Sequence, residues 1–161
     1  MPRKFTSSKK EMETFLRRET IGWLGLSKAG RSYVVPLNYA YVDGRIYFHC
    51  ALKGKKLDFI RANPDVCFAV GRQTGEVRRH AGSKVCHVDN DSVLCFGRAR
   101  VIKDLSERAV ALNAFLHAFA PGAPDLPRER VKGCAAVEIV VREMTGRRER
   151  ARKRTLWRHV F

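Results

Sequence analysis

The sequence lacks any apolar run long enough to cross a membrane, because no stretch approaches the roughly 20 residues that a spanning helix needs. Its first residues, MPRKFTSSKKEME, are charged and hold no apolar segment of the kind found in a secretory signal. We therefore expect a cytoplasmic protein with no membrane partner. A length of 161 residues predicts one domain with a sizeable core.

The sequence also lacks the short motifs of several large enzyme classes. It contains no Walker loop, no Rossmann glycine motif and no Ser-His-Asp or Cys-His nucleophile arrangement. The carboxylates form no evident acid–base pair. These absences exclude the common nucleotide-hydrolysing and acyl-transfer chemistries.

The cysteines form no CxxC pair. The five cysteines are Cys50, Cys67, Cys86, Cys95 and Cys134. Four lie in apolar runs, where a thiol behaves as a small hydrophobic side chain, so we expect reduced thiols and no disulfide framework. Potential ligands between His80 and Asp91 match no zinc spacing, and we predict no metal site.

Acidic residues are outnumbered two to one, with 16 Asp and Glu against 32 Lys and Arg, for a net charge of +16. Residues 146–161 contribute +6 of this, which leaves +10 on the rest of the chain. Such a basic segment, with Trp157 inside it, can bind nucleic-acid phosphates and stack bases. Because the charge extends over the whole protein, anionic ligands in general are favoured over nucleic acid.

The most informative stretch runs from Tyr33 to Lys56, YVVPLNYAYVDGRIYFHCALKGKK. Asp43-Gly44 separates two alternating runs and predicts a two-residue β-hairpin, in which Val42 faces Arg45. Continued pairing would place Leu37 opposite Cys50. One face of the hairpin then carries core side chains, which are Leu37, Tyr39, Tyr41, Ile46, Phe48 and Cys50.

The second face of this hairpin carries smaller and more polar side chains, which are Pro36, Asn38, Ala40, Tyr47 and His49. We interpret it as a surface that accepts a flat ligand. Pro36 has no N–H for a sheet ladder, so its place suits a strand edge or a bulge.

The hairpin leads through Lys53-Gly54-Lys55-Lys56 into a predicted helix that stops at Asn63-Pro64. Exposed lysines in a first helical turn oppose the macrodipole, at a cost of about 0.3–1 kcal/mol each. A bound phosphate would reverse that sign. The charges alone leave both interpretations open, a phosphate cradle or solvated lysines.

The rest of the chain predicts short strands and few helices. Predicted helices cover Ser8–Glu19, with a Ser8/Glu11 capping box, and Leu105–Phe119. Predicted strands cover Ile21–Ser27, Val66–Val70, Ser92–Ile102 and Ala135–Met144, the last ended by Thr145-Gly146. Residues 71–90 are polar, basic and glycine-containing and follow neither pattern, and Gly97 predicts a bulge or a close backbone approach.

Strands joined mostly by hairpins favour an all-β fold with peripheral helices, built as a closed or split antiparallel barrel. The regular strand–helix alternation of a parallel α/β fold is missing. We expect the barrel domain over residues 1–145 and a basic C-terminal tail over residues 146–161.

Four segments, VVPLNY, DGRIYFHCALKGKK, DSVLCFGRARVI and VEIVVREMTGRR, together resemble the flavin-binding split-barrel proteins of the pyridoxamine-phosphate-oxidase superfamily. The similarity runs from about Glu19 to Arg148 and is nearest to the nitroimidazole-resistance (Nim) branch. It implies a six-stranded antiparallel split β-barrel of the FMN-binding type, in which residues 71–90 form a hairpin tip or loop. It also implies a homodimer with FMN at the subunit interface, FAD being the alternative.

The resemblance further assigns site residues. The phosphate cradle would comprise Lys53, Lys55 and Lys56, with backbone help from Ala51 to Gly54, and His49 and Cys50 are further candidate cofactor contacts. The flavin ring would be held by the backbone of Pro36, Leu37, Asn38 and Tyr39, with Ser92 and Val93 as a further wall. His49 matches the active-site histidine of the Nim proteins and is the catalytic candidate. The alternative for His49 is a structural bond to the sheet or to the partner subunit. Asn90-Asp91 departs from the family pattern, so its contacts are not carried over.

By this resemblance the protein is an FMN-dependent oxidoreductase that passes electrons to a small acceptor, such as a nitroaromatic, a quinone-like compound or a pyridoxal derivative. A flavin carrier or sensor without turnover is one alternative, and a nucleic-acid-binding protein using residues 146–161 is another. The acceptor, the electron donor and the role of that basic segment are not determined by the sequence.

Overall fold

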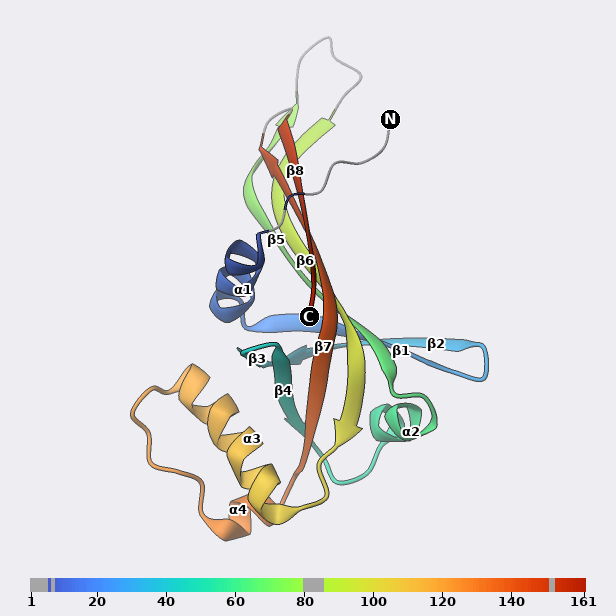
Figure 1. Cartoon of the computed structure of the whole chain (residues 1–161), viewed down its shortest axis with the longest axis vertical. Helices are drawn as coiled ribbons and strands as arrows, with labels where there is room; N and C mark the ends of the chain where they lie inside the picture. Colours follow the sequence, from blue (N-terminus) through green and yellow to red (C-terminus); the bar gives the residue numbers. More distant parts are fainter. Residues whose placement is uncertain (1–5, 7, 80–85, 151–152) are drawn as a thin grey trace.

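The computed structural model describes residues 6, 8–79, 86–150 and 153–161, with backbone only for 76–79 and 86–87 (Figure 1). The helices are α1 (Lys9–Arg18), α2 (Lys55–Ala62), α3 (Leu105–Phe119) and α4 (Arg128–Lys132). The strands are β1 (Ile21–Lys28), β2 (Arg31–Asn38), β3 (Ala40–Val42), β4 (Arg45–Cys50), β5 (Asp65–Arg79), β6 (Cys86–Val101), β7 (Ala135–Arg150) and β8 (Lys153–Val160). In the part of the chain that is described, no helix is long and apolar enough to span a membrane.

All strands join one antiparallel sheet in the order β2-β1-β5-β6-β7-β4-β3, and β8 pairs with β7. The described residues thus form eight strands rather than six, and the β-rich split-barrel fold is confirmed. Strands β5 to β8 extend as a long twisted ribbon, while α2, α3 and α4 gather at the opposite end of the molecule (Figure 1). The sheet does not close, since β2 and β3 are its two edges.

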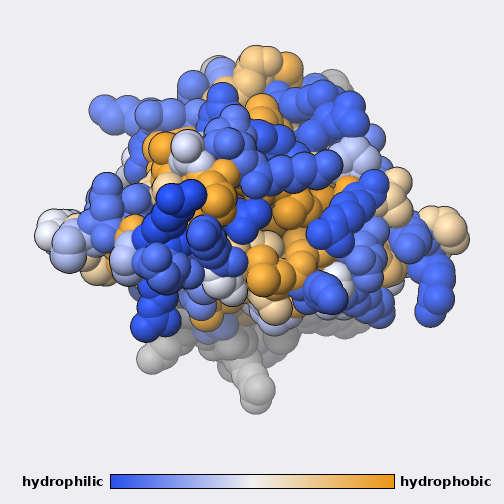
Figure 2. All heavy atoms as spheres, turned by 90° about the horizontal axis from the view of Figure 1, so that it is seen from below, coloured by the Kyte–Doolittle hydropathy of each residue, from blue (hydrophilic) through white to orange (hydrophobic). Residues whose placement is uncertain are grey.

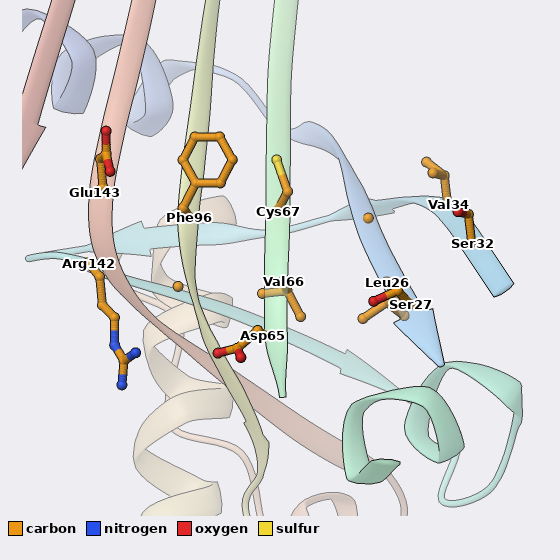
Figure 3. A pocket seen from close by; sticks show the side chains of 12 residues that line it. Leu26, Ser27, Ser32, Val34, Asp65, Val66, Cys67, Phe96, Arg142 and Glu143 are labelled. Carbon is orange, nitrogen blue, oxygen red and sulfur yellow. The ribbon is translucent and has the colours of Figure 1, made fainter. Parts of the chain in front are cut away.

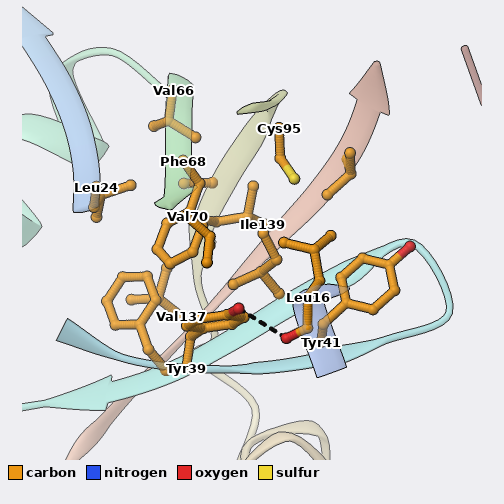
Figure 4. Packing of buried hydrophobic residues seen from close by; sticks show 14 of the residues in the cluster. Leu16, Leu24, Tyr39, Tyr41, Val66, Phe68, Val70, Cys95, Val137 and Ile139 are labelled. Carbon is orange, nitrogen blue, oxygen red and sulfur yellow. Dashed lines mark hydrogen bonds between the residues drawn. The ribbon is translucent and has the colours of Figure 1, made fainter. Parts of the chain in front are cut away.

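One residue, Tyr39, joins the two edges of the sheet. The chain leaves β2 at Asn38 and enters β3 at Ala40, so it crosses from one edge to the other through Tyr39 alone. The Tyr39 side chain is buried, and its hydroxyl donates to the Leu16 carbonyl oxygen at 2.7 Å. Its ring packs edge-to-face on Phe68 with centroids 4.9 Å apart (Figure 4). The residue that connects the two edge strands of the open barrel is therefore fixed in position by the core.

This crossing decides which part of the predicted hairpin forms. Strands β3 and β4 pair in the predicted register, with Val42 opposite Arg45 and Ala40 opposite Tyr47. The predicted continuation is wrong, because β2 pairs with β1 and Leu37 faces Gly22 instead of Cys50. Strand β4 pairs with β7 on its other side.

The predicted core face of the hairpin is confirmed. Tyr39, Tyr41, Ile46 and Phe48 are buried in the main core, and Leu37 and Cys50 pack against it. The predicted second face does not form one surface, because β2 and β4 are not neighbours: Pro36 and Asn38 are exposed on β2, His49 is exposed on β4, Tyr47 is half-buried and Ala40 is buried. A smaller core lies under α3 and α4 and includes Ile102, Leu112 and Val131.

Most predicted helices and strands are present, with three corrections. Ser8 precedes α1 but makes no side-chain cap, so the capping box is wrong. The predicted hairpin tip or loop over 71–90 is part of a β5–β6 hairpin, but the strands extend to Arg79 and resume at Cys86, because polar residues are tolerated in a strand whose faces meet solvent; residues 80–85 lie outside the described residues. Helix α4 was not predicted, although Pro127 at its N-cap was a usable signal.

The predicted end of the last strand at Thr145-Gly146 is also wrong, since β7 continues to Arg150. A Cβ at Gly146 would come within 2.8 Å of the Trp157 ring and 2.9 Å of the Met12 sulfur. Gly146 therefore makes room for side chains packed on β7 and does not terminate it. Trp157 is buried in β8, so the basic segment 146–161 contributes a strand to the sheet.

Much of the basic charge of this segment is paired within the ribbon. The buried Asp91 accepts from Arg148 at 3.1 Å and from Arg150 at 2.9 Å. Arg158 pairs with Glu143 at 2.6 Å. Hydrogen bonds from Arg147, then Arg154, lower the pKa of Glu149 to about 2. The arginines thus neutralise carboxylates on neighbouring strands.

Gly97 lies at a β-bulge, where the register of β6 against β7 shifts between Phe96 and Gly97. The predicted bulge is therefore confirmed. The predicted close backbone approach is confirmed too, because a Cβ on Gly97 would overlap the Val140 carbonyl. Gly71 on β5 offers a contrast, since its nearest atoms would be 3.9 Å from an added Cβ.

We expect Gly97→Ala to lower the free energy of unfolding by about 2 kcal/mol, because the added Cβ would overlap the backbone of β7, which cannot move aside as a flexible side chain can. The matched Gly71→Ala variant should stay within about 0.5 kcal/mol of wild type. Denaturant unfolding followed by circular dichroism measures both. Equal midpoints for the two variants would contradict the close approach at Gly97.

The lowered pKa of Glu149 predicts a specific acid sensitivity. Its ordinary pKa is 4.5 and its folded pKa is about 2. The carboxylate therefore stabilises the fold fully above pH 4.5, and this contribution is lost as the pH falls from 4.5 to 2. Glu149→Gln should flatten the loss of stability over that range. Glu11→Gln, at an exposed carboxylate with no ion pair among the described residues, is the control and should retain the wild-type slope.

Candidate functional site

The predicted site residues lie in three places. The core holds the side chains of Tyr39 and Val93, with Leu37 and Cys50 packed against it. The β4–α2 loop and the start of α2 carry Ala51, Lys53, Gly54, Lys55 and Lys56. The outer faces of the sheet carry Pro36 and Asn38 on β2, Ser92 on β6 and His49 on β4. The structure therefore divides the predicted set among two faces of the sheet and one loop.

The β4–α2 loop ends in an open helix N-terminus. Gly54 has φ 145° and ψ 162°, a conformation that is essentially restricted to glycine. Its carbonyl accepts from the amides of Leu57 and Asp58, and Gly54, as the N-cap residue, provides no side-chain cap. A Cβ at Gly54 would meet nothing within 4 Å. The first turn of α2 is thus accessible to an external anion.

The lysines of this turn are oriented by aromatic rings. The Lys55 Nζ lies 4.5 Å from the Tyr33 ring centroid, and the Lys56 Nζ lies 5.6 Å from the Phe48 ring centroid. Within the described structure, neither of these lysines nor Lys53 forms an ion pair with a carboxylate. Their charge is therefore available to an anionic group at the N-terminus of α2.

Cys50 lies close to these lysines. Burial raises the pKa of the Cys50 thiol, and the positive charge of Lys56 opposes that rise. The thiol therefore stays protonated at neutral pH and contributes packing rather than a nucleophile.

His49 lies on the other face of β4. Successive side chains of a strand point to opposite faces, so His49 points away from the face that carries Cys50 and Phe48. Its ring meets Phe115 of α3 edge-to-face, with centroids 4.8 Å apart. It lines a cavity of about 580 Å³ with residues of α3 and α4. The catalytic candidate and the side chain of Cys50 therefore occupy different faces of the same strand.

The outer face of β2, β1, β5 and β6 is apolar. Cross-strand pairing aligns Pro36, Trp23, Ala69 and Leu94 in one row, so their side chains share this face. Trp23 is 41% exposed, Val34 61% and Phe96 40%. A hollow of about 600 Å³ opens beside Val34 and Phe96 (Figure 3). Pro36 lies on the edge strand β2, as its missing N–H predicted.

Asn38 and Ser92 also lie on outer faces. The Asn38 side-chain amide donates to the Thr20 carbonyl at 2.9 Å, which fixes its orientation at the edge of the sheet. Ser92 pairs across strands with Gly71 and Arg147. The departure at Asn90-Asp91 has a structural use, since Asp91 binds two arginines and Asn90 donates to Glu149.

A polar cluster beneath α3 was missed by the sequence reasoning. The buried Glu138 accepts from Arg45 and Arg100 at 2.8 Å each and from the Tyr47 hydroxyl at 3.2 Å. Burial acts to raise its pKa, but the hydrogen bonds from both arginines hold the pKa below its ordinary value. A usable signal was the carboxylate inside the apolar run AAVEIVV, since a buried charge requires partners.

No group of three His, Cys, Asp or Glu able to hold a metal occurs among the residues whose side chains are described. The sequence cluster from His80 to His87 lies outside that set. The predicted absence of a metal therefore stays a prediction.

Comparisons with known proteins agree with this fold. The sequence model described as pyridoxamine 5'-phosphate oxidase matches residues 8–148. A candidate 5-nitroimidazole antibiotic resistance protein of Bacteroides thetaiotaomicron is 21% identical, with 88% of this chain and 84% of that chain covered and a TM-score of 0.76. A FAD-binding protein of Mesorhizobium loti is 26% identical, with 89% and 96% covered and a TM-score of 0.67.

A FAD and heme binding protein of Mycobacterium smegmatis is 17% identical, with 84% of this chain and 67% of that chain covered and a TM-score of 0.73. A search of curated proteins finds no match. Because the family match spans most of the chain, this protein belongs to the pyridoxamine 5'-phosphate oxidase family.

Proposed function

We propose that the protein is a cytoplasmic flavoprotein, and that it acts as an FMN-dependent oxidoreductase on a small acceptor. Family membership supports flavin binding, as do fold neighbours from Mesorhizobium loti and Mycobacterium smegmatis that are described as FAD-binding. FMN is the cofactor that we propose, and FAD is the alternative. The acceptor class is a nitroaromatic, a quinone-like compound or a pyridoxal derivative.

The observation that carries this proposal is the open N-terminus of α2. Gly54 lets the chain turn without a Cβ, and Lys53, Lys55 and Lys56 place three positively charged side chains at and next to the first turn. Amides, helix dipole and lysine charge all favour an anion at one place. A flavin phosphate supplies that anion and removes the electrostatic conflict between these lysines and the helix dipole.

The remaining candidate residues fall into two groups, buried residues and exposed residues. Tyr39 and Val93 are buried in the core of the single chain, so their role would be to support the strands that carry the exposed candidates. Pro36, Asn38 and Ser92 present side chains on exposed faces of the sheet. When bound, a flavin supplies the hydride chemistry, and the protein binds and orients it. His49 stays the catalytic candidate, with an exposed imidazole that can hold or transfer a proton.

We also propose a homodimer with the flavin at the subunit interface. The apolar outer face of β2, β1, β5 and β6 supports it, because contiguous exposed apolar surface on a globular protein marks an interaction site. Val34, Trp23 and Phe96 would be covered by the second subunit. Pro36 and Asn38 border this surface, which agrees with a cofactor held between the two chains.

The purified protein should absorb in the visible range and release about one FMN per chain on denaturation. Lys55→Glu/Lys56→Glu should lower flavin affinity at least tenfold, because two attractive charges near the phosphate become repulsive. Lys28→Glu/Arg31→Glu makes the same change in net charge at the exposed β1–β2 turn and should retain wild-type affinity. A colourless wild type that takes up no added flavin would refute the proposal.

An oxidoreductase should reduce its bound flavin with NADH or NADPH and reoxidise it with a nitroaromatic or quinone over many turnovers. Anaerobic absorbance at the flavin band, followed by acceptor addition, measures both half-reactions. His49→Gln should slow acceptor reduction while flavin content stays at the wild-type value. Stoichiometric flavin without turnover on any acceptor class would identify a carrier or sensor instead.

A further inference from the structure

The cavity under α3 has the size of a ligand site. It holds about 580 Å³, within the range of small-molecule pockets. Its walls come from α3, α4 and the outer face of β4, at the end of the molecule opposite the long ribbon. Seen from this end, hydrophobic surface is exposed in patches between hydrophilic side chains (Figure 2).

The cavity is formed before any ligand binds, because the loop from Ala120 to Pro127 is tied to α3. The Leu126 amide donates to the Asn113 side-chain oxygen at 2.9 Å, and the His117 ring bonds the Ala123 carbonyl at 3.1 Å. The buried Val131 then anchors α4 in the smaller core. Because the cavity is preformed, little of the binding free energy is lost to ordering its walls when a ligand binds.

One wall of the cavity is aromatic. Phe115 and Phe119 lie one helical turn apart on α3 with their rings stacked, centroids 4.7 Å apart. The His49 ring meets Phe115 edge-to-face at 4.8 Å. Leu112, Leu116 and Leu126 complete the apolar lining. Flat ring faces and edges of this kind favour a planar aromatic ligand.

The cavity has few polar side chains, and these are not engaged in hydrogen bonds or ion pairs among the described residues. Arg130, Glu129 and His49 line it, and their side chains form no hydrogen bond or ion pair within the described part of the chain. Arg130 presents a guanidinium, the group best shaped to bind a carboxylate with two hydrogen bonds. The net charge of +16 attracts anions to the protein as a whole.

We propose that this cavity binds a small aromatic carboxylate, with its ring against Phe115 and Phe119 and its carboxylate on Arg130. Glu129 repels the carboxylate from its own side of the opening and so sets the orientation. The cavity shares His49, the catalytic candidate, with the proposed function, but it includes none of the lysines at α2, so carboxylate binding here does not require a flavin phosphate at the α2 turn.

The test uses 2-naphthoate as the probe, with 2-naphthylmethanol as its uncharged analogue, titrated into the full-length protein by isothermal calorimetry. We expect one naphthoate site per chain. Arg130→Gln should weaken naphthoate about tenfold and leave the alcohol nearly unchanged, as expected for loss of a charge-assisted pair. Arg128→Gln, on the same helix but outside the cavity lining, is the matched control and should bind like wild type.

Leu116→Trp fills the cavity and should abolish binding of both probes. Absence of saturable naphthoate binding would overturn the proposal, as would equal effects of Arg130→Gln and Arg128→Gln, which indicate general charge attraction. Binding that survives Leu116→Trp would assign the probe to another surface. Flavin content measured on the same samples separates failure of this cavity from failure of the α2 site. Arg130 is exposed, so its substitution tests the proposal even if Leu116→Trp does not fold.

Discussion

The structure depends on one crossing of the chain, at Tyr39, between the two edges of its sheet. The crossing holds because the Tyr39 ring is buried against Phe68 and its hydroxyl satisfies the Leu16 carbonyl of α1. A buried phenol that is fully bonded costs little, whereas the same group unpaired would cost about 1–3 kcal/mol. Helix α1, the edge strands and the core are therefore coupled through one side chain.

This crossing also determines how the functional residues are distributed. Because the chain changes partner strand at Tyr39, Pro36 and Asn38 belong to the outer face of β2, while His49 belongs to β4 under α3. The open turn at Gly54 follows β4 directly. Two surfaces with different chemistry result, an anion-attracting helix start and an aromatic cavity. A dimer would add the apolar outer face of the sheet as a third.

The excess positive charge has two different roles in the molecule. Along the ribbon, Arg148, Arg150 and Arg158 bind carboxylates on adjacent strands and so hold the strands together. Lys55 and Lys56 make no such pairs within the described residues and rest over aromatic rings. Charge that is paired internally stabilises a sheet, and charge left unpaired at a helix start serves ligands. The basic segment 146–161 is mainly of the first kind.

Local sequence patterns were sufficient for much of this protein. The Asp43-Gly44 turn, the core face through Tyr41, Ile46 and Phe48, the helix over Leu105–Phe119 and the bulge at Gly97 depend on periodicity and turn chemistry, which neighbouring residues determine. Only the tertiary structure decided that β2 pairs with β1 and not with β4, that Gly146 makes room for the Trp157 ring, and that Glu138 accepts hydrogen bonds from two arginines. Each of these depends on residues distant in sequence, whose meeting is determined by the packing of the whole chain.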